Sequence, residues 1–124
     1  MVVPKDIRLA PILPNIIPDD FLLGYSMPTT YGGTKLSVSC FADRKVHLLG
    51  GHPARQRDLA DKLDVYSIDC NRLTLDASFG DYFDGETFRP HPVGGYKLCI
   101  RDSIININRL WDRYELKYKS GKGK

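Results

Sequence analysis

The order of apolar and polar residues predicts a strand, a helix and a second strand in the middle of the chain. Residues 46–49 form an apolar run that ends in Gly50-Gly51, and a second run at residues 65–68 ends at Asp69. Residues 54–63 lie between the two runs and carry apolar side chains at the spacing of one helical face. Because parallel strands end at the same edge of a sheet, we expect the glycines and Asp69 to lie side by side there.

The same pattern predicts further elements on both sides of this unit. Residues 21–25 are expected to form a strand, and residues 2–3 resemble the end of another one. Residues 9–17 are apolar but interrupted by two prolines, which allows only a short helix. Residues 72–95 form a long connection rich in glycine and proline, which is uncommon unless it carries function or holds a small hairpin.

The final element is predicted to be a long amphipathic helix at residues 96–114. Large apolar residues recur along it at spacings of four and three, and the opposite side is polar. We interpret the apolar side as core packing rather than as a cofactor site. Its residues are Tyr96, Ile100, Ile104, Ile107, Trp111 and Tyr114.

The alternation of strands and helices predicts an α/β fold with three to four parallel strands, flanking helices and a long C-terminal helix. A closed (β/α)8 barrel takes eight strands and typically about 250 residues, and this chain has 124 residues. The chain therefore forms either a small open sheet or a partial (β/α)8, TIM-barrel-like domain without its first half. We assign residues 1–116 to this incomplete α/β domain.

The net charge of +3 is unevenly distributed along the chain. Residues 113–124 hold five basic residues and one acidic residue, a balance of +4, which leaves −1 for the rest of the chain. A basic end of this kind can contact nucleic acid, although it is more often only solvated. We assign residues 117–124 to a disordered basic tail and leave contact with nucleic acid open.

The cysteine content indicates the compartment. Cys40, Cys70 and Cys99 lie far apart in the sequence, and their number is odd. This argues against a disulfide framework and is typical of proteins of the reducing cytoplasm. No run approaches the roughly 18 consecutive apolar residues that a membrane span needs. We therefore expect a cytoplasmic protein with no membrane partner.

Three segments resemble the last three strands of the tRNA-guanine transglycosylases. In that family a Gly-Tyr strand is followed by a Leu-Met-Gly-Val-Gly strand and loop, then by a helix and a strand that ends in Phe-Asp-Cys. The Asp of this last motif is the family's covalent nucleophile, and Asp69, followed by Cys70, matches its position and order. The matching segments are Gly24-Tyr25-Ser26, Lys45-Val46-His47-Leu48-Leu49-Gly50-Gly51-His52-Pro53 and Asp64-Val65-Tyr66-Ser67-Ile68-Asp69-Cys70-Asn71-Arg72.

The chain is also similar to a group of uncharacterised phage and actinobacterial proteins related to deazapurine DNA-modification proteins. Residues 8–14, 76–85 and 91–96 carry this second similarity. The two resemblances together imply the C-terminal half of a transglycosylase-like barrel, whose other acidic base-recognition residues would lie upstream of Met1. They imply DNA or tRNA as a partner, and a missing N-terminal half. If the chain is such a fragment, we expect it to expose an apolar sheet edge and to form a homodimer or aggregate.

The resemblance implies exchange of a nucleobase for a 7-deazaguanine derivative, with Asp69 as the catalytic nucleophile that forms a glycosyl-enzyme intermediate. An aspartate that only caps the turn after the strand would explain the residue as well. For the whole chain, one alternative is a non-catalytic truncated remnant or nucleic-acid-binding module. Another is a different sugar- or phosphate-directed barrel enzyme that shares only the fold.

Several residues are candidates for substrate binding. The pairs Gly50-Gly51 and Gly94-Gly95 could let a base or a phosphate approach the backbone closely, or could only form tight turns. Arg72, which follows the predicted strand at residues 65–68, could pair a phosphate, and Tyr31, beside Gly32-Gly33, could stack on a base. These candidates are Gly50, Gly51, Gly94, Gly95, Arg72, Tyr31, Gly32 and Gly33.

No metal ion or cofactor is expected. The zinc-binding Cys-x-Cys-x-x-Cys and His cluster of the transglycosylases has no counterpart, because the histidines are scattered. Asp81, Asp84 and Glu86 could suggest a hard-cation site, but their spacing is more typical of a solvated turn. We interpret His47 as a packed histidine with satisfied hydrogen bonds, and Cys70 as a small buried residue.

Overall fold

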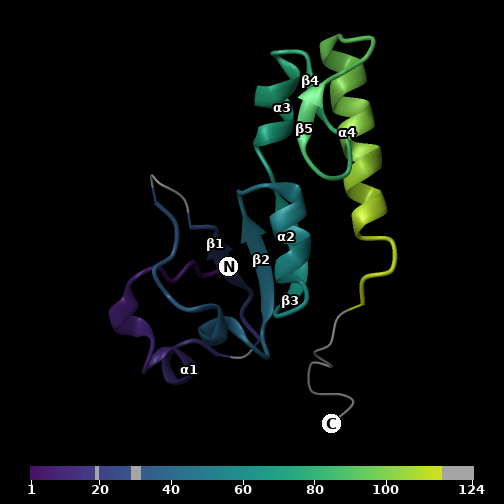
Figure 1. Cartoon of the computed structure of the whole chain (residues 1–124). Helices are drawn as coiled ribbons and strands as arrows, with labels where there is room; N and C mark the ends of the chain where they lie inside the picture. The colour runs from purple at the N-terminus through teal and green to yellow at the C-terminus, as the bar shows by residue number, and fades with distance from the viewer. Residues whose placement is uncertain (19, 29–31, 116–124) are drawn as a thin grey trace.

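A computed structural model describes residues 1–18, 20–28 and 32–115. Tyr31 and the predicted basic tail at residues 117–124 lie outside the described residues. The described part contains a three-stranded parallel sheet and a two-stranded antiparallel hairpin with flanking helices (Figure 1). This is the mixed α/β architecture that the sequence predicts. No helix within these described ranges is both long and apolar enough to cross a membrane.

The parallel sheet consists of β1 (Leu23–Ser26), β2 (Lys45–Leu49) and β3 (Asp64–Asp69), in that order. Val2 extends it beyond β1 through an isolated parallel bridge to Leu23. The three predicted strands and the predicted stub at the N-terminus are therefore confirmed. Strand order follows chain order, so that each strand pairs with its predecessor.

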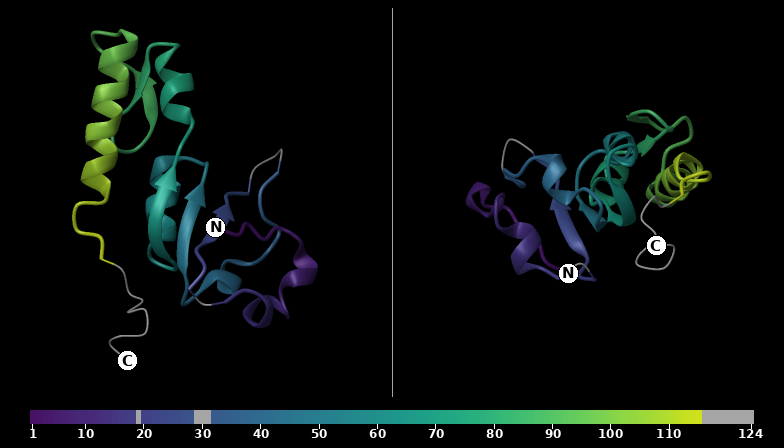
Figure 2. Two further views of the ribbon diagram at one scale, coloured as in Figure 1. Left: turned by 180° about the vertical axis from the view of Figure 1, so that it is seen from behind. Right: turned by 90° about the horizontal axis from the view of Figure 1, so that it is seen from below.

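One face of this sheet carries the hydrophobic core. The segments that cover it include η1 (Ile7–Leu9), α1 (Leu13–Ile16), η2 (Val38–Phe41) and α2 (Pro53–Leu59). In Figures 1 and 2, the N-terminal segment lies beyond β1 and the C-terminal helix lies beyond β3. The core cluster consists of Leu13, Ile17, Leu23, Tyr25, Met27, Leu36, Phe41, Val46, Leu48, Ala60, Leu63 and Val65.

The strand registers separate the side chains into two faces. Leu23 pairs with Val46, and both side chains are fully buried on the core face. Gly24 pairs with His47, so that the alternate positions point to the opposite face. Between β2 and β3 the register shifts at Val46/His47, and His47 thereby lies opposite Ser67. The polar side chains of the two strands therefore share the face that lies away from the core.

The predicted long connection contains α3 (Arg72–Ala77) and a hairpin formed by β4 (Asp81–Phe83) and β5 (Phe88–Pro90). The hairpin is one of the two outcomes expected for this segment, whereas α3 was not predicted. The Asp84 carboxylate accepts two backbone N–H groups of the turn at 2.9 Å each. This contact supports the interpretation of the acidic residues as part of a turn.

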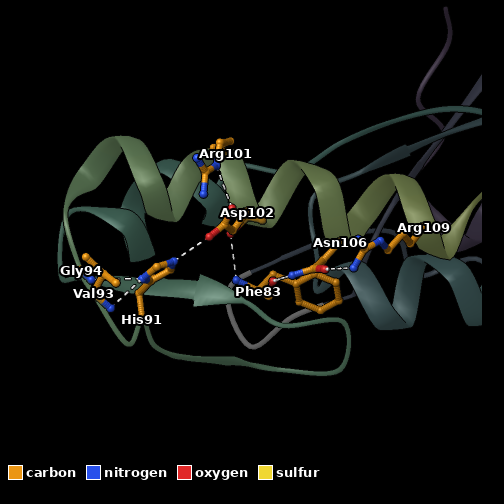
Figure 3. Close-up of polar contacts among 9 residues, drawn as sticks. Phe83, His91, Val93, Gly94, Arg101, Asp102, Asn106 and Arg109 are labelled. Atoms are coloured by element: carbon orange, nitrogen blue, oxygen red, sulfur yellow. Dashed lines mark hydrogen bonds and ion pairs between the residues drawn. The ribbon is translucent and has the colours of Figure 1, made fainter.

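The final helix, α4 (Tyr96–Leu110), ends before the predicted residue 114, and the face that it buries is only partly the predicted one. Trp111 and Tyr114 of the predicted stripe pack against the core cluster. Ser103 is buried, whereas Tyr96 and Ile104 are exposed at 51% and 44%. The Ser103 hydroxyl accepts the N–H of Phe83 at 2.8 Å. The Asn106 amide donates to the carbonyl of Phe83 at 2.8 Å (Figure 3). The predicted stripe is wrong at these positions because α4 packs against strand backbone, which needs polar partners.

Candidate functional site

Asp69 is the last residue of β3 and lies beside the turn that follows β2. The backbone N–H of Gly50 donates to Asp69 Oδ1 at 3.1 Å. Gly50 and Gly51 have φ angles of 74° and 89°, a left-handed backbone that glycine adopts without steric cost. The expected proximity of the first glycine pair and Asp69 is therefore observed.

The second carboxylate oxygen of Asp69 faces an imidazole ring. His47 Nε2 lies 3.3 Å from Asp69 Oδ2, and His47 Nδ1 lies 2.6 Å from the hydroxyl of Ser67. The His47 side chain is 16% exposed and that of Asp69 is 50% exposed. His47 has satisfied hydrogen bonds, as expected, but the sequence analysis did not connect it with Asp69. The contact could have been suspected from the sequence, because Ser67 and Asp69 are two residues apart and therefore share one face of a strand.

A buried amide joins the ends of the two strands at this site. The side chain of Gln56, on α2, donates hydrogen bonds of 2.8 Å to the carbonyl oxygens of Gly50 and Asp69. Gln56 is fully buried. The Cys70 thiol donates to the carbonyl of Gly51 at 3.4 Å, and partial burial raises the pKa of this thiol. This partly buried contact agrees with the interpretation of Cys70 as a small packing residue.

A cleft of about 450 Å³ opens next to the same glycine turn. One of its arginines, Arg72, stacks on the ring of Phe88 at 4.3 Å and donates to the carboxylate of Asp76 at 3.0 Å. The candidate Arg72 thus lies near the turn that also contacts Asp69. We refer to this hollow as the arginine cleft, and its lining residues are Met27, Pro28, Gly51, His52, Arg55 and Arg72.

His52 forms the N-terminal cap of α2 and one wall of the arginine cleft. Its Nδ1 accepts the backbone N–H of Ala54 at 3.1 Å, so that the neutral ring carries its proton on Nε2. Partial burial lowers the pKa of His52, and the positive charges of Arg72 and Arg55 lower it further. The neutral ring can therefore donate a hydrogen bond from Nε2.

Of the other candidate glycines, the second pair lies away from this site, whereas Gly33 packs against Met27 and Pro28, which line the arginine cleft. Gly94 and Gly95 precede α4, which begins at the end of the molecule away from the parallel sheet (Figure 1). At Gly33 a Cβ atom would lie 2.3 Å from the Met27 carbonyl oxygen, so a close backbone approach explains this glycine. Gly32 lies in the loop after β1. Tyr31, the proposed stacking residue, falls outside the described residues.

A second polar cluster, not anticipated from the sequence, joins the hairpin to α4 (Figure 3). His91 Nε2 lies 2.7 Å from Asp102 Oδ2, and His91 Nδ1 accepts the N–H groups of Val93 and Gly94 at 3.1 Å each. A hydrogen bond from Arg101 lowers the pKa of Asp102, and the bond from His91 lowers it further. Both ring nitrogens of His91 are thus occupied within the fold, which indicates a structural role.

Metal ligands do not cluster in the described ranges, where no group of three or more His, Cys, Asp or Glu residues could hold an ion. A protein-family model described as a family of unknown function (DUF6610) matches residues 1–112. No curated protein and no solved structure matches the chain. The geometry of Asp69 and of the arginine cleft is therefore the basis for assigning a function.

Proposed function

The chain belongs to the DUF6610 family, and we propose that it takes part in base exchange on a nucleic acid as the C-terminal portion of a transglycosylase-like protein. One observation carries the proposal. The Asp69 carboxylate sits at the carboxyl end of a parallel strand and is held by the backbone N–H of Gly50 at 3.1 Å. Catalytic groups of (β/α)8 enzymes occupy this end of their strands.

The proposed chemistry uses Asp69 as the nucleophile. A carboxylate oxygen attacks the anomeric carbon of a nucleotide, the glycosidic C–N bond breaks, and its electron pair leaves with the base, which takes up a proton. An incoming 7-deazaguanine derivative then attacks the same carbon and loses a proton, and the ester bond to Asp69 breaks. This reaction needs a carboxylate that is held in place, and the backbone N–H of Gly50 holds one of its oxygens at 3.1 Å.

His47 and Ser67 support the same role as positioning residues. In the arrangement that satisfies all three groups, Ser67 donates to His47 Nδ1, and His47 donates from Nε2 to Asp69. Each oxygen of the Asp69 carboxylate then has one donor, which restricts its rotation. A restricted carboxylate loses less entropy when it attacks an anomeric carbon.

We further infer that the parallel sheet is an arc of a (β/α)8, TIM-barrel-like fold. The strand order follows chain order, and residues from the segments before and between the strands share one core cluster on one face. Right-handed connections in this order place helices on one face only, as in a barrel. A doubly wound sheet reverses its order and carries helices on both faces. A second copy or a missing N-terminal half would supply the remaining arc.

The test is incorporation of labelled 7-deazaguanine into DNA or tRNA by the full chain. We expect incorporation by the wild type, loss of it in Asp69→Asn, and retention in Asp112→Asn, which removes an exposed carboxylate outside the site. Full incorporation by Asp69→Asn would contradict the role of Asp69 as the nucleophile. No incorporation by the wild type with either nucleic acid would contradict completion of the site by a second copy of this chain.

The second candidate function is a nucleic-acid-binding module without catalysis. The two arginines of the arginine cleft favour it, because arginine is the side chain best suited to bind phosphate. Binding of DNA or tRNA by a wild type that incorporates no label would support this candidate against the first.

A further inference from the structure

The two arginines of the arginine cleft are held in different ways. Arg72 is fixed by the ring of Phe88 and by the carboxylate of Asp76, at 4.3 Å and 3.0 Å. A guanidinium has five N–H donors in a planar fork. Arg72 can therefore bind an anion while it keeps its contact with Asp76, and its orientation is set before the anion arrives.

Arg55 supplies a charge that the fold does not neutralise. Its side chain is exposed, and it makes no hydrogen bond or ion pair with any residue in the described ranges. His52 also lines the cleft. Its Nδ1 accepts the backbone N–H of Ala54, which leaves Nε2–H as a donor. Two guanidinium groups and one imidazole thus line the cleft, and no carboxylate is among the described residues that line it.

We propose that the arginine cleft binds a phosphate or phosphodiester group, with Arg72 and Arg55 as the charged donors and His52 as a neutral one. Its volume of about 450 Å³ exceeds what a single phosphate fills and falls within the roughly 300–1,000 Å³ of ordinary ligand sites. The proposal does not depend on Asp69 and stands whether or not the chain performs base exchange.

An adjoining hollow shows where the rest of such a ligand would lie. This second hollow, of about 510 Å³, shares Met27, Pro28 and Arg55 with the arginine cleft. Its other lining residues are Tyr25, Leu59, Asp58, Asp61 and Lys62. The two carboxylates offset the positive charges of Lys62 and Arg55 there, whereas no carboxylate is among the described residues that line the arginine cleft. The phosphate would therefore occupy the Arg72 end, and the remainder of the ligand would lie against the apolar residues.

The experiment measures binding by the full chain of a short single-stranded DNA oligonucleotide and, separately, of inorganic phosphate. Backbone amide NMR shifts of Gly51 and Arg55 report the location, and fluorescence anisotropy across salt concentrations reports the affinity. The variants are Arg55→Ala and Arg72→Ala. The control is Arg8→Ala, which removes the same charge from an arginine whose side chain is 87% exposed and does not line the cleft.

We expect each cleft variant to bind about tenfold more weakly or worse, the loss of one charge-assisted hydrogen bond, and Arg8→Ala to bind like the wild type. The slope of log K against log salt should fall by about 0.7 for each phosphate contact removed from a single strand. Arg55→Ala removes no hydrogen bond or ion pair within the described ranges, and a denaturation midpoint equal to that of the wild type would confirm that weaker binding by this variant is not due to unfolding.

Two outcomes would overturn the proposal: wild-type affinity in both cleft variants, or an equal loss of affinity in Arg8→Ala. If inorganic phosphate shifts the same amides with the same dependence on the two arginines, the ligand is a free phosphate compound. If only the oligonucleotide does so, it is a nucleic acid strand. Binding is measured without turnover, which separates a failure here from a failure of base exchange.

Discussion

The hydroxyl group of Tyr114 accepts a hydrogen bond of 2.5 Å from the backbone N–H of Val65, on the outer edge of β3. The same hydroxyl donates to the carbonyl of Leu63 at 3.3 Å. An open strand edge is a template for pairing with another chain. At this edge one tyrosine hydroxyl serves both backbone groups, in the place that a further strand would occupy.

We predict that Tyr114→Phe destabilises the protein and promotes self-association. The substitution keeps the ring but leaves Val65 N–H and Leu63 C=O without this partner, which should cost about 1–3 kcal/mol of unfolding free energy. Chemical denaturation measures the cost, and sedimentation at several protein concentrations measures association. Tyr96→Phe, at a tyrosine that is 51% exposed, is the control and should change neither quantity. Wild-type stability in Tyr114→Phe would refute this account of the edge.

The hairpin has an edge of the same kind, and α4 satisfies it through Ser103. We predict that Ser103→Ala destabilises the protein by about 1–3 kcal/mol, because the N–H of Phe83 is left buried without an acceptor. Hydrogen exchange at the Phe83 amide should be faster in this variant. Ser78→Ala, which removes an exposed hydroxyl that bonds only to a nearby carbonyl, is the matched control. Unchanged exchange at Phe83 would show that its N–H does not depend on Ser103.

The strands of the parallel sheet could be predicted because each is a short apolar run bounded by turn formers. The face that α4 buries could not, because hydrophobic periodicity assumes a side-chain partner. The partner here is the backbone of Phe83, and the helix meets it with Ser103 and Asn106. The six residues of α3 are too few to show a helical period, and Asn71 makes no capping hydrogen bond that would mark its start.

The candidate site likewise has one feature that the sequence predicts and one that it does not. The proximity of Gly50 and Asp69 follows from the rule that parallel strands end at one edge. The contact of His47 with Ser67 and Asp69 depends on the register shift, which skips Tyr66 so that His47 lies opposite Ser67. Without this irregularity the two residues would lie on opposite faces, since a slip of one position reverses every side chain. A sequence alone does not contain the register.

The side-chain amide of Gln56 links the ends of β2 and β3 through its hydrogen bonds to Gly50 and Asp69. We predict that Gln56→Glu is severely destabilising at neutral pH. A carboxylate would face the carbonyl oxygens of Gly50 and Asp69, and a buried unpaired charge costs about 3–5 kcal/mol. Burial raises the pKa of such a glutamate. Its folded form therefore binds more protons than its unfolded form, and stability should be regained as the pH falls through the raised pKa.

Denaturation midpoints across pH measure this effect, and Gln56→Met is the comparison. Methionine has a similar shape and cannot ionise, so its cost should stay near about 1–3 kcal/mol at every pH. It also removes the Oε1 atom of Gln56, which is buried and has no hydrogen-bond partner among the described residues. Equal pH profiles for the two variants would mean that the glutamate is not buried between the strand ends.

The last prediction concerns the titration of His52. Partial burial, followed by the charges of Arg72 and Arg55, lowers its pKa below the ordinary value of 6.5. The unfolded chain therefore binds more protons than the folded one between the lowered pKa and 6.5. The stability that His52 contributes is complete above this interval and is lost as the pH falls through it. The midpoint of the His52 imidazole resonance, followed by NMR, gives the folded pKa directly.

Removing a positive charge from the arginine cleft should raise that midpoint. We expect an upward shift of the His52 pKa in Arg72→Ala and a smaller one in Arg55→Ala, because Arg72 has the larger electrostatic effect on this ring. Saturation of the wild type with phosphate should also raise the midpoint, since a bound anion favours the protonated ring. His47 and His91 do not line the cleft and provide internal references. A His52 midpoint that neither arginine variant nor phosphate moves would show that the two guanidinium groups do not act on this ring.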